Sequence, residues 1–227
     1  MKIIIFSDTH LTTDFEEDRF RFLKHIISQA DKVIINGDFW EGWQITFSEF
    51  IESPWNKLFP FLKGKETIYL YGNHDKKEYC DKRVFLFSSH QATHYKFKIG
   101  NQSFFVEHGD RINFAYKKLF YKQFFKSISH YPFFVKRAAL LEKIIVKSGL
   151  KRLLDRNGRL LTFEIIKQRD HEKGNSEIYI CGHTHLGFYD KKHQFLNDGF
   201  IRHGVGQYVE INEKGEVFLR DMNYSTK

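Results

Sequence analysis

The sequence predicts an α/β fold whose largely parallel sheet carries helices on its faces. Two observations lead to this fold class. Short apolar strands alternate with amphipathic helical segments in the first third of the chain, and further strands follow near its C-terminus. With 227 residues and a hydrophobic content of 41%, the chain is long enough to form one well-cored domain.

The N-terminal third contains three predicted strands and the helical segments between them. Residues 2–7, 32–37 and 67–72 form short apolar runs, which indicates buried strands. Residues 14–30 place large apolar side chains at helical spacing. Residues 47–62 have the same spacing but contain two prolines, so we expect short or broken helices there.

The rest of the chain divides into a hairpin, an insertion and a second group of strands. Alternating residues around a Gly-Asn bend predict a hairpin over 93–110. Residues 111–174 read as a helical insertion, so the expected core comprises 1–110 and 175–227. The strands expected in the last part are 177–182, 193–201, 206–211 and 216–221.

The net charge of +8 is concentrated in the insertion. Residues 111–174 hold 16 Lys and Arg against 5 Asp and Glu, whereas the remaining residues hold 20 and 23. Many aromatic residues accompany these cations, so residues 113–172 could form a lid that faces an anionic partner. A solvated basic helical face with an aromatic core remains the simpler alternative.

Cysteine content and hydropathy indicate the cell compartment in which the protein is expected. Cys80 and Cys181 are the only cysteines, which excludes a disulfide framework and favours a reducing compartment. The apolar N-terminal run is too short for a secretory signal, and no run approaches the roughly 18 residues of a membrane span. We therefore expect a cytoplasmic protein, free or peripheral on the inner face of the inner membrane.

Polar residues that can bind metals follow five of the predicted strands. Ligands bind outside the carboxyl ends of strands in open α/β sheets, so these residues are expected to meet at one rim. Taken singly, each has an ordinary explanation, such as a helix N-cap for an aspartate or a buried hydrogen-bonded histidine. The set comprises Asp8, His10, Asp38, Asn73, His74, Asp75, His108, His183 and His185.

The residue types in this set indicate divalent metals. Carboxylate and imidazole ligands suit Mn, Fe and Zn, and the absence of thiolates from the motifs argues against a structural zinc site. Seven of the groups are too many for one ion. Two ions that share a carboxylate would use them all, and such pairs serve phosphoryl displacement.

Five sequence blocks carry a resemblance to a known family. "SDTH", "NGDFWEGW", "YGNHD", "EHGD" and "CGHTH" resemble the signature blocks of the calcineurin-like metallophosphoesterases, and they occur in order from Asp8 to His185. The resemblance implies a β-sandwich flanked by helices. It also implies two divalent metal ions, with Mn as the first expectation and Fe or Zn as alternatives.

The same resemblance implies a role for each residue. His74 would lie near the phosphate and assist the leaving oxygen, and Asp75 would orient the His74 ring. Asn73, His74 and His183 would contact the substrate. Asp8, His10 and His185 would hold one ion, Asn73, His108 and His183 the other, and Asp38 would bridge the two ions together with the water that attacks phosphorus.

The block "GDFWEGW" is similar to one in UDP-2,3-diacylglucosamine pyrophosphatases, which act in lipid A synthesis. Hydrolysis of that pyrophosphate to UMP and 2,3-diacylglucosamine 1-phosphate is therefore the expected reaction, with a lipid-sugar substrate and an anionic membrane surface as partners. Three departures weaken the match: His74 where the group often has arginine, Gln-Ile-Thr after Trp43, and "NDGF" from Asn197.

Three alternatives remain open. The chain could be a general phosphodiesterase or phosphatase acting on nucleotides or phosphoproteins. It could be a nucleic-acid-binding module, although no nucleic-acid motif occurs in the sequence. It could also be a metal-binding scaffold without turnover, but no expected ligand is missing. The sequence predicts no oligomeric state.

Overall fold

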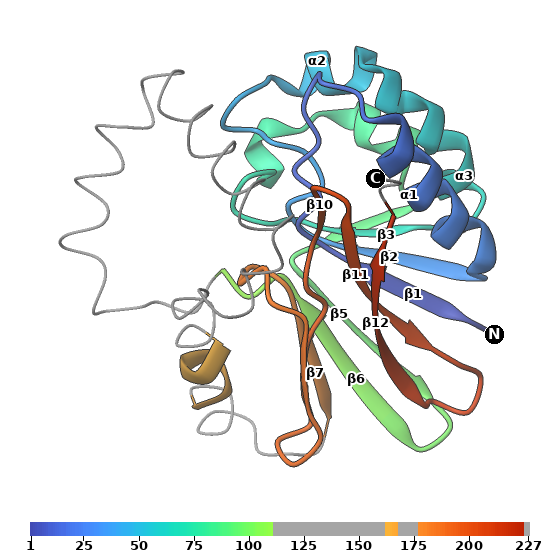
Figure 1. Cartoon of the computed structure of the whole chain (residues 1–227), viewed down its shortest axis with the longest axis vertical. Coiled ribbons are helices and arrows are strands. Elements are labelled where there is room, and N and C mark those ends of the chain that lie inside the picture. The colour runs from blue at the N-terminus through green and yellow to red at the C-terminus, as the bar shows by residue number, and fades with distance from the viewer. Residues whose placement is uncertain (111–161, 168–176, 225–227) are drawn as a thin grey trace, which may run out of the picture.

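The computed structural model of the chain describes residues 1–110, 162–167 and 177–224 (Figure 1). Two sheets face each other, and helices cover the outer face of the first sheet (Figure 1). The predicted α/β class and the β-sandwich flanked by helices are both confirmed.

The first sheet is seven-stranded and mixed. Its strands β1 to β4 run parallel in chain order, and β11 pairs antiparallel with β1. Both β10 and β12 pair antiparallel with β11. The strands are β1 (Ile3–Phe6), β2 (Lys32–Asn36), β3 (Ile68–Leu70), β4 (His90–Ala92), β10 (Ile201–Arg202), β11 (Val205–Ile211) and β12 (Val217–Asn223).

The second sheet is five-stranded, with the order β5-β6-β7-β9-β8. Strands β5 and β6 form the predicted hairpin, and β6, β7 and β9 are parallel. The strands are β5 (His94–Ile99), β6 (Gln102–Glu107), β7 (Ile178–Cys181), β8 (Phe188–Asp190) and β9 (Phe195–Asn197).

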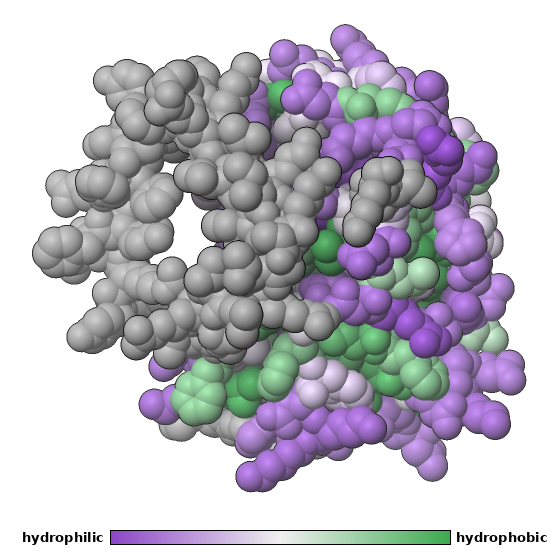
Figure 2. Space-filling view, viewed as in Figure 1, coloured by the Kyte–Doolittle hydropathy of each residue, from purple (hydrophilic) through white to green (hydrophobic). Residues whose placement is uncertain are grey.

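Alternation along the strands separates two hydrophobic cores. In β1, Ile3 and Ile5 point between the two sheets, whereas Ile4 and Phe6 pack under the helices. All four are buried, because a strand covered on both faces needs apolar residues at every position. Figure 2 shows a largely hydrophilic surface over the helices and a hydrophobic band across the middle of this face.

The helices of the first sheet follow the sequence pattern. The region with two prolines is broken, as predicted, into α2, a 3₁₀-helix and α3, and each proline lies in the first turn of its element. A capping box between Thr46 and Glu49 begins α2. The elements are α1 (Glu17–Gln29), α2 (Phe47–Glu52), α3 (Phe59–Lys63) and the 3₁₀-helices η1 (Pro54–Leu58), η2 (Lys77–Tyr79) and η3 (Lys82–Leu86).

Part of the predicted insertion is described. Residues 162–167 are helical, and Ile165 and Ile166 pack in one cluster with Phe105 and Tyr179 of the second sheet. The rest of the insertion over 111–174, and with it most of the lid expected over 113–172, lies outside the described residues.

The structure differs from the prediction near the C-terminus. Residues 193–201 were predicted to form one strand, but they contain the end of a turn, then β9, and then the first residue of β10. Strand β9 belongs to the second sheet and β10 to the first. Between them Gly199 has a φ of +82°, a conformation that suits glycine and lets the chain cross from one sheet to the other.

Candidate active site

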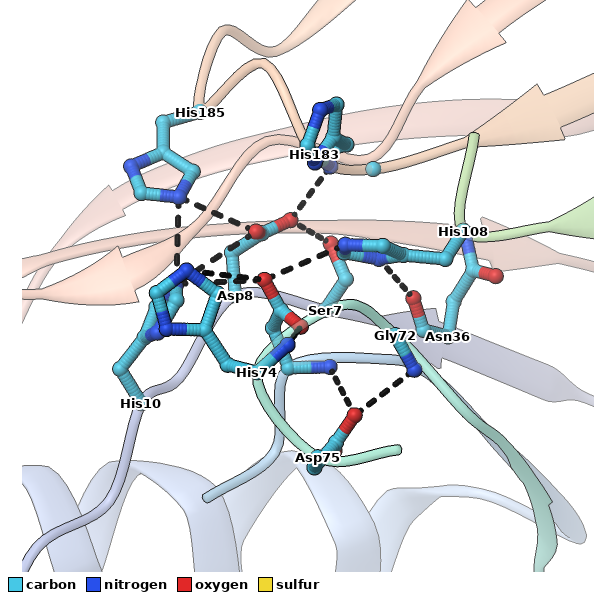
Figure 3. A network of polar contacts seen from close by, with 12 residues as sticks. Ser7, Asp8, His10, Asn36, Gly72, His74, Asp75, His108, His183 and His185 are labelled. Atoms are coloured by element: carbon cyan, nitrogen blue, oxygen red, sulfur yellow. Dashed lines mark hydrogen bonds and ion pairs between the residues drawn. The ribbon is translucent and has the colours of Figure 1, made fainter. Parts of the chain in front are cut away.

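The metal-binding residues of the five sequence blocks lie at the carboxyl ends of five strands. Because β1, β2 and β3 are parallel, and β6 and β7 are parallel in the facing sheet, these ends meet at one rim of the sandwich (Figure 3). The residues are Asp8 and His10 after β1, Asp38 after β2, Asn73 and His74 after β3, His108 after β6, and His183 and His185 after β7.

The first group that could hold a metal ion consists of Asp8, His10 and His185. The Nε2 atom of His185 lies 3.1 Å from Oδ1 of Asp8 and 3.2 Å from Nε2 of His10. The Nε2 atom of His10 lies 3.6 Å from the same Asp8 oxygen. Three donor atoms from opposite ends of the chain therefore point into one small space.

The second group consists of Asp38, His108 and His183. The Oδ2 atom of Asp38 is 3.2 Å from Nε2 of His108 and also 3.7 Å from Nε2 of His10. One carboxylate oxygen of Asp38 thus reaches residues of both groups. This is the position that a bridging ligand needs.

Three buried atoms of the site that could bind a metal make no hydrogen bond of good geometry, although a neighbouring ligand atom lies 3.1 Å from the first and 3.2 Å from the third. They are Oδ1 of Asp8, Oδ1 of Asn73 and Nε2 of His108. Leaving such an atom unpaired costs about 1–3 kcal/mol, and a cation bound among the three would remove that cost. Two oxygen atoms and one imidazole nitrogen suit a divalent transition metal.

Charge interactions in the site also favour a cation. Burial by itself lowers the pKa of His10, but two neighbouring carboxylates outweigh burial and raise this pKa to about 9. These carboxylates therefore favour a positive charge beside them, and a bound metal ion would supply it in place of the His10 proton. Burial lowers the pKa of His183 to about 4, with the nearby His108 adding to the effect. His183 is therefore neutral at pH 7, and neutral imidazole is the form that binds metals.

Hydrogen bonds behind the ligands fix the orientation of two imidazoles. Nδ1 of His10 bonds to Oε2 of Glu41 at 2.9 Å, and Nδ1 of His108 donates to the carbonyl oxygen of Asn36 at 2.8 Å. In both residues Nε2 is left to face the site. A partner of this kind fixes the ring tautomer of a metal-binding histidine.

The backbone at the ligands is strained. Among the described residues, eight other than glycine have a positive φ, and five of these are predicted ligands. Such residues cost about 1–3 kcal/mol each and persist where the surrounding structure holds them. The five are Asp8 (φ 52°), His10 (44°), Asp38 (52°), His183 (68°) and His185 (53°).

Two glycines allow the blocks to approach one another. A Cβ at Gly182 would lie 2.2 Å from Oγ of Ser7 and 2.6 Å from Oδ2 of Asp8. A Cβ at Gly72 would lie 2.2 Å from Oδ1 of Asp38. Any other residue at these positions would displace a carboxylate of the site.

His74 lies beside both groups, and Glu41 holds its ring. Nε2 of His74 is 4.0 Å from Oδ2 of Asp38, and Nδ1 bonds to Oε1 of Glu41 at 2.6 Å. Ligand atoms of His10, Glu41 and His74 also lie within 4.8 Å of one another, close enough to hold a metal ion. We read them as a hydrogen-bonded triad, because both nitrogens that face Glu41 are Nδ1 atoms at hydrogen-bond distance.

The expected role of Asp75 is corrected by this geometry. Its carboxylate does not orient the His74 ring, because both of its oxygens accept other hydrogen bonds. Oδ1 accepts from the backbone N–H groups of Asp38 and Gly72, and Oδ2 accepts from the N–H of Phe39 and the hydroxyl of Tyr69. Asp75 therefore ties the β2 and β3 loops together.

Glu41 takes the role that the sequence analysis gave to Asp75. It is 4% exposed, and burial by itself raises its pKa, but hydrogen bonds to the two histidines outweigh burial and lower the pKa to about 2. The signal was present in the sequence. Glu41 is an acidic residue in the block "NGDFWEGW", three residues after Asp38.

A second buried carboxyl lies behind Asp8. Oγ of Ser7 contacts Oδ2 of Asp8 and lies 2.5 Å from Oδ1 of Asp198. One hydroxyl proton cannot serve two carboxylates, so one of them must carry a proton. Burial and the charge of Asp8 raise the pKa of Asp198 to about 8. Asp198 is thus the protonated group: it donates to Ser7, and Ser7 donates to Asp8.

The other histidines of the described residues lie outside these metal-binding groups. Nε2 of His25 bonds to Gln29 on α1, and Nδ1 of His193 bonds to Asp190. His90 and His94 lie exposed on strands, and His203 has a φ of 56° in the turn after β10. His130 and His171 fall outside the described part of the chain.

The described helices do not include a membrane span. None of them has the length and apolar character that crossing a bilayer requires.

Comparison with known proteins identifies a family for the chain. The sequence profile of the calcineurin-like phosphoesterases matches residues 1–187. No individually curated protein matches the chain.

Similar solved structures include a single mutant of Vps29 from Entamoeba histolytica, with 13% identity and a TM-score of 0.49 over 99% of this chain and 100% of that one. The phosphoesterase Yfce from E. coli has the same identity, TM-score and coverage. Vacuolar protein sorting 29 from Cryptosporidium parvum has 13% identity and a TM-score of 0.43 over 98% and 97% of the chains.

Because the profile match covers most of the 227 residues and contains all of the predicted metal ligands, the chain belongs to the calcineurin-like phosphoesterase family.

Proposed function

We propose that the chain hydrolyses the pyrophosphate bond of UDP-2,3-diacylglucosamine, giving UMP and 2,3-diacylglucosamine 1-phosphate, with two Mn²⁺ ions bound at the site. The observation that carries the proposal is the arrangement at Asp38, whose carboxylate lies between two groups of metal-binding residues and beside His74. Metal-dependent phosphoester hydrolysis is the activity of the family. The particular substrate and the choice of Mn²⁺ are proposed.

The donor set divides between two ions. When bound, two divalent ions lower the pKa of a water molecule and stabilise the attacking and leaving oxygens of phosphoryl transfer. Carboxylate, amide and imidazole donors together suit Mn²⁺. Asp8, His10 and His185 would hold one ion, Asn73, His108 and His183 the other, and Asp38 would contact both.

His74 supplies the proton for the leaving group. The bond from its Nδ1 to Glu41 turns Nε2 toward Asp38 and the space where the phosphate binds. A proton donor held this way contributes typically 10²–10⁴-fold to the rate. Asn73 and His183, at the same rim, would contact phosphoryl oxygens.

Two features support the lipid-sugar substrate. The block "GDFWEGW", which is similar to one in UDP-2,3-diacylglucosamine pyrophosphatases, forms the loop of the site that carries Asp38 and Glu41. The described piece of the basic, aromatic insertion reaches the site loop, because Oγ1 of Thr162 lies 3.1 Å from Oγ1 of Thr184, between two of the ligands. The insertion would accommodate acyl chains and contact anionic lipid headgroups at the cytoplasmic face of the inner membrane.

A general phosphodiesterase or phosphatase is the second candidate. His74 favours it, because the lipid-sugar group often has arginine at that position. In this case nucleotide or phosphoprotein substrates would replace the acylated sugar, while the metals, Asp38 and His74 would keep the same roles.

A substrate panel with Mn²⁺ distinguishes the two candidates. The panel contains UDP-2,3-diacylglucosamine, bis-p-nitrophenyl phosphate and p-nitrophenyl phosphate. We expect the acylated sugar nucleotide to have the highest kcat/KM, all hydrolysis to be lost in Asp38→Ala, and a loss of about 10²-fold or more in His74→Ala. Asp190→Ala, which removes a surface carboxyl, is the matched control and should retain full activity. Hydrolysis of the small esters alone would favour the second candidate, and activity that survives in Asp38→Ala would refute both.

A further inference from the structure

Three consecutive residues, Glu41, Gly42 and Trp43, pack on His74. Glu41 bonds to the imidazole, and a Cβ at Gly42 would lie 2.2 Å from the His74 carbonyl oxygen, so the loop approaches His74 only with glycine there. The indole of Trp43 stacks on the imidazole, with ring centroids 3.7 Å apart and planes inclined by 23°. This three-residue loop therefore contacts both the ring and the backbone of the proton donor.

Packing in the core does not account for Trp43. Its side chain is 61% exposed, whereas Trp40 in the same loop is 1% exposed and Trp55 is fully buried. A large aromatic residue left this exposed contributes little burial to the fold. One face of the indole stacks on His74, while more than half of the Trp43 residue surface stays exposed to solvent.

The location of Trp43 points to a ligand. His74 contacts His10 of the first metal group, with ring centroids 4.5 Å apart, and it contacts Trp43 as well. A phosphate bound between the metal-binding groups and His74 would place one of its substituents next to the indole. Trp43 therefore lies where the non-reacting part of the substrate begins.

We propose that the exposed face of Trp43 is a stacking platform for a planar ring of the substrate, and that this ring is a nucleobase. The inference rests on the proposed function, because a nucleotide-sugar substrate supplies such a ring. An indole face stacks on any base and discriminates against substituents that lack a π-face. Trp43 would thus determine specificity for nucleotides over other phosphate esters.

Binding measurements test the platform without turnover. The affinities of UMP and ribose 5-phosphate are measured by calorimetry on the Mn²⁺-loaded protein. Both ligands carry the same 5-phosphate, and only UMP carries a base. Stacking on an aromatic residue is worth about tenfold to a hundredfold in affinity. We expect UMP to bind tighter by this factor, Trp43→Leu to bring the two affinities within about twofold, and Trp43→Phe to retain most of the preference.

The controls separate the platform from other roles of Trp43. Phe218→Leu removes an exposed aromatic residue of β12 and should leave the preference unchanged. An equal preference for UMP in wild type and Trp43→Leu would overturn the proposal, as would equal affinities of the two ligands in wild type. A Trp43-dependent preference in a protein that does not hydrolyse UDP-2,3-diacylglucosamine would support the platform and refute only the proposed substrate.

Discussion

Replacement of Asp198 by asparagine should stabilise the metal-free protein at pH 8. Asp198 is fully buried and joined to Asp8 through the hydroxyl of Ser7. Its Oδ2 accepts a hydrogen bond from Nδ2 of Asn36 at 3.1 Å. An asparagine can accept from Asn36 and donate to Ser7, which is the arrangement of the protonated acid. The substitution therefore keeps the network and removes only the charge that appears at high pH.

The pH dependence has a definite sign. Burial and the charge of Asp8 raise the pKa of Asp198 from 3.8 to about 8, so the folded state holds this proton more tightly than the unfolded state. The contribution to stability is complete below pH 3.8 and is lost as the pH rises toward 8. A pKa that rises by one on folding corresponds to about 1.4 kcal/mol of stability. The gain in Asp198→Asn should therefore reach a few kcal/mol at pH 8 and vanish near pH 4.

Urea unfolding followed by tryptophan fluorescence, with EDTA present, measures this difference. Asp190→Asn is the control, because it removes a surface carboxyl whose hydrogen bonds to His193 lower its pKa, and it should give no gain at pH 8. A gain for Asp198→Asn that is absent at pH 8, or that does not change between pH 4 and pH 8, would refute the assignment of the proton to Asp198.

Three further predictions concern the site and the thiols. Glu41→Gln should lower kcat and Mn²⁺ affinity by about 10–100-fold in steady-state kinetics and metal titration, because the carboxylate that orients two histidines is lost. Gly182→Ala, whose Cβ would lie 2.6 Å from Oδ2 of Asp8, should weaken Mn²⁺ binding by at least about tenfold. Gly64→Ala is the control for this substitution. A Cβ at Gly64 would lie no closer than 3.3 Å to any atom beyond its chain neighbours, so this variant should keep the wild-type Mn²⁺ affinity. Burial raises the pKa of Cys80 to about 12 and that of Cys181 well above its usual value, so neither thiol should react with Ellman's reagent in the folded protein at pH 7, and both should react in urea.

The sequence predicted the parts of the fold in which local pattern and tertiary role agree. The strand at Ile3–Phe6 is apolar because it is buried on both faces, and the prolines of residues 47–62 break that region as their chemistry requires. Strands β4 and β8 were not predicted. Each has three residues, and their exposed or partly exposed side chains give no hydrophobic run. They are strands because they pair with neighbouring strands, β4 with β3 and β8 with β9.

In the candidate site too, the sequence predicted some features and only the structure showed the others. The residues that face the metals stand in recognisable blocks, and the structure brings Asp8, His10 and His185 together from opposite ends of the chain. The sequence could not assign separate roles to Glu41 and Asp75, because each carboxylate lies close along the chain to a residue of the site: Glu41 to Asp38, and Asp75 to His74. Only the geometry shows that Glu41 reaches the His74 ring and that Asp75 turns toward the backbone.

Electron paramagnetic resonance of the protein titrated with Mn²⁺ tests the central claim most directly. If the carboxylate of Asp38 bridges two ions, the protein should bind two Mn²⁺ per chain and show the exchange-coupled signal of a close pair. Asp38→Ala should lose that coupling, and Asp190→Ala should keep it. Binding of a single ion, or of two ions without coupling, would contradict the account.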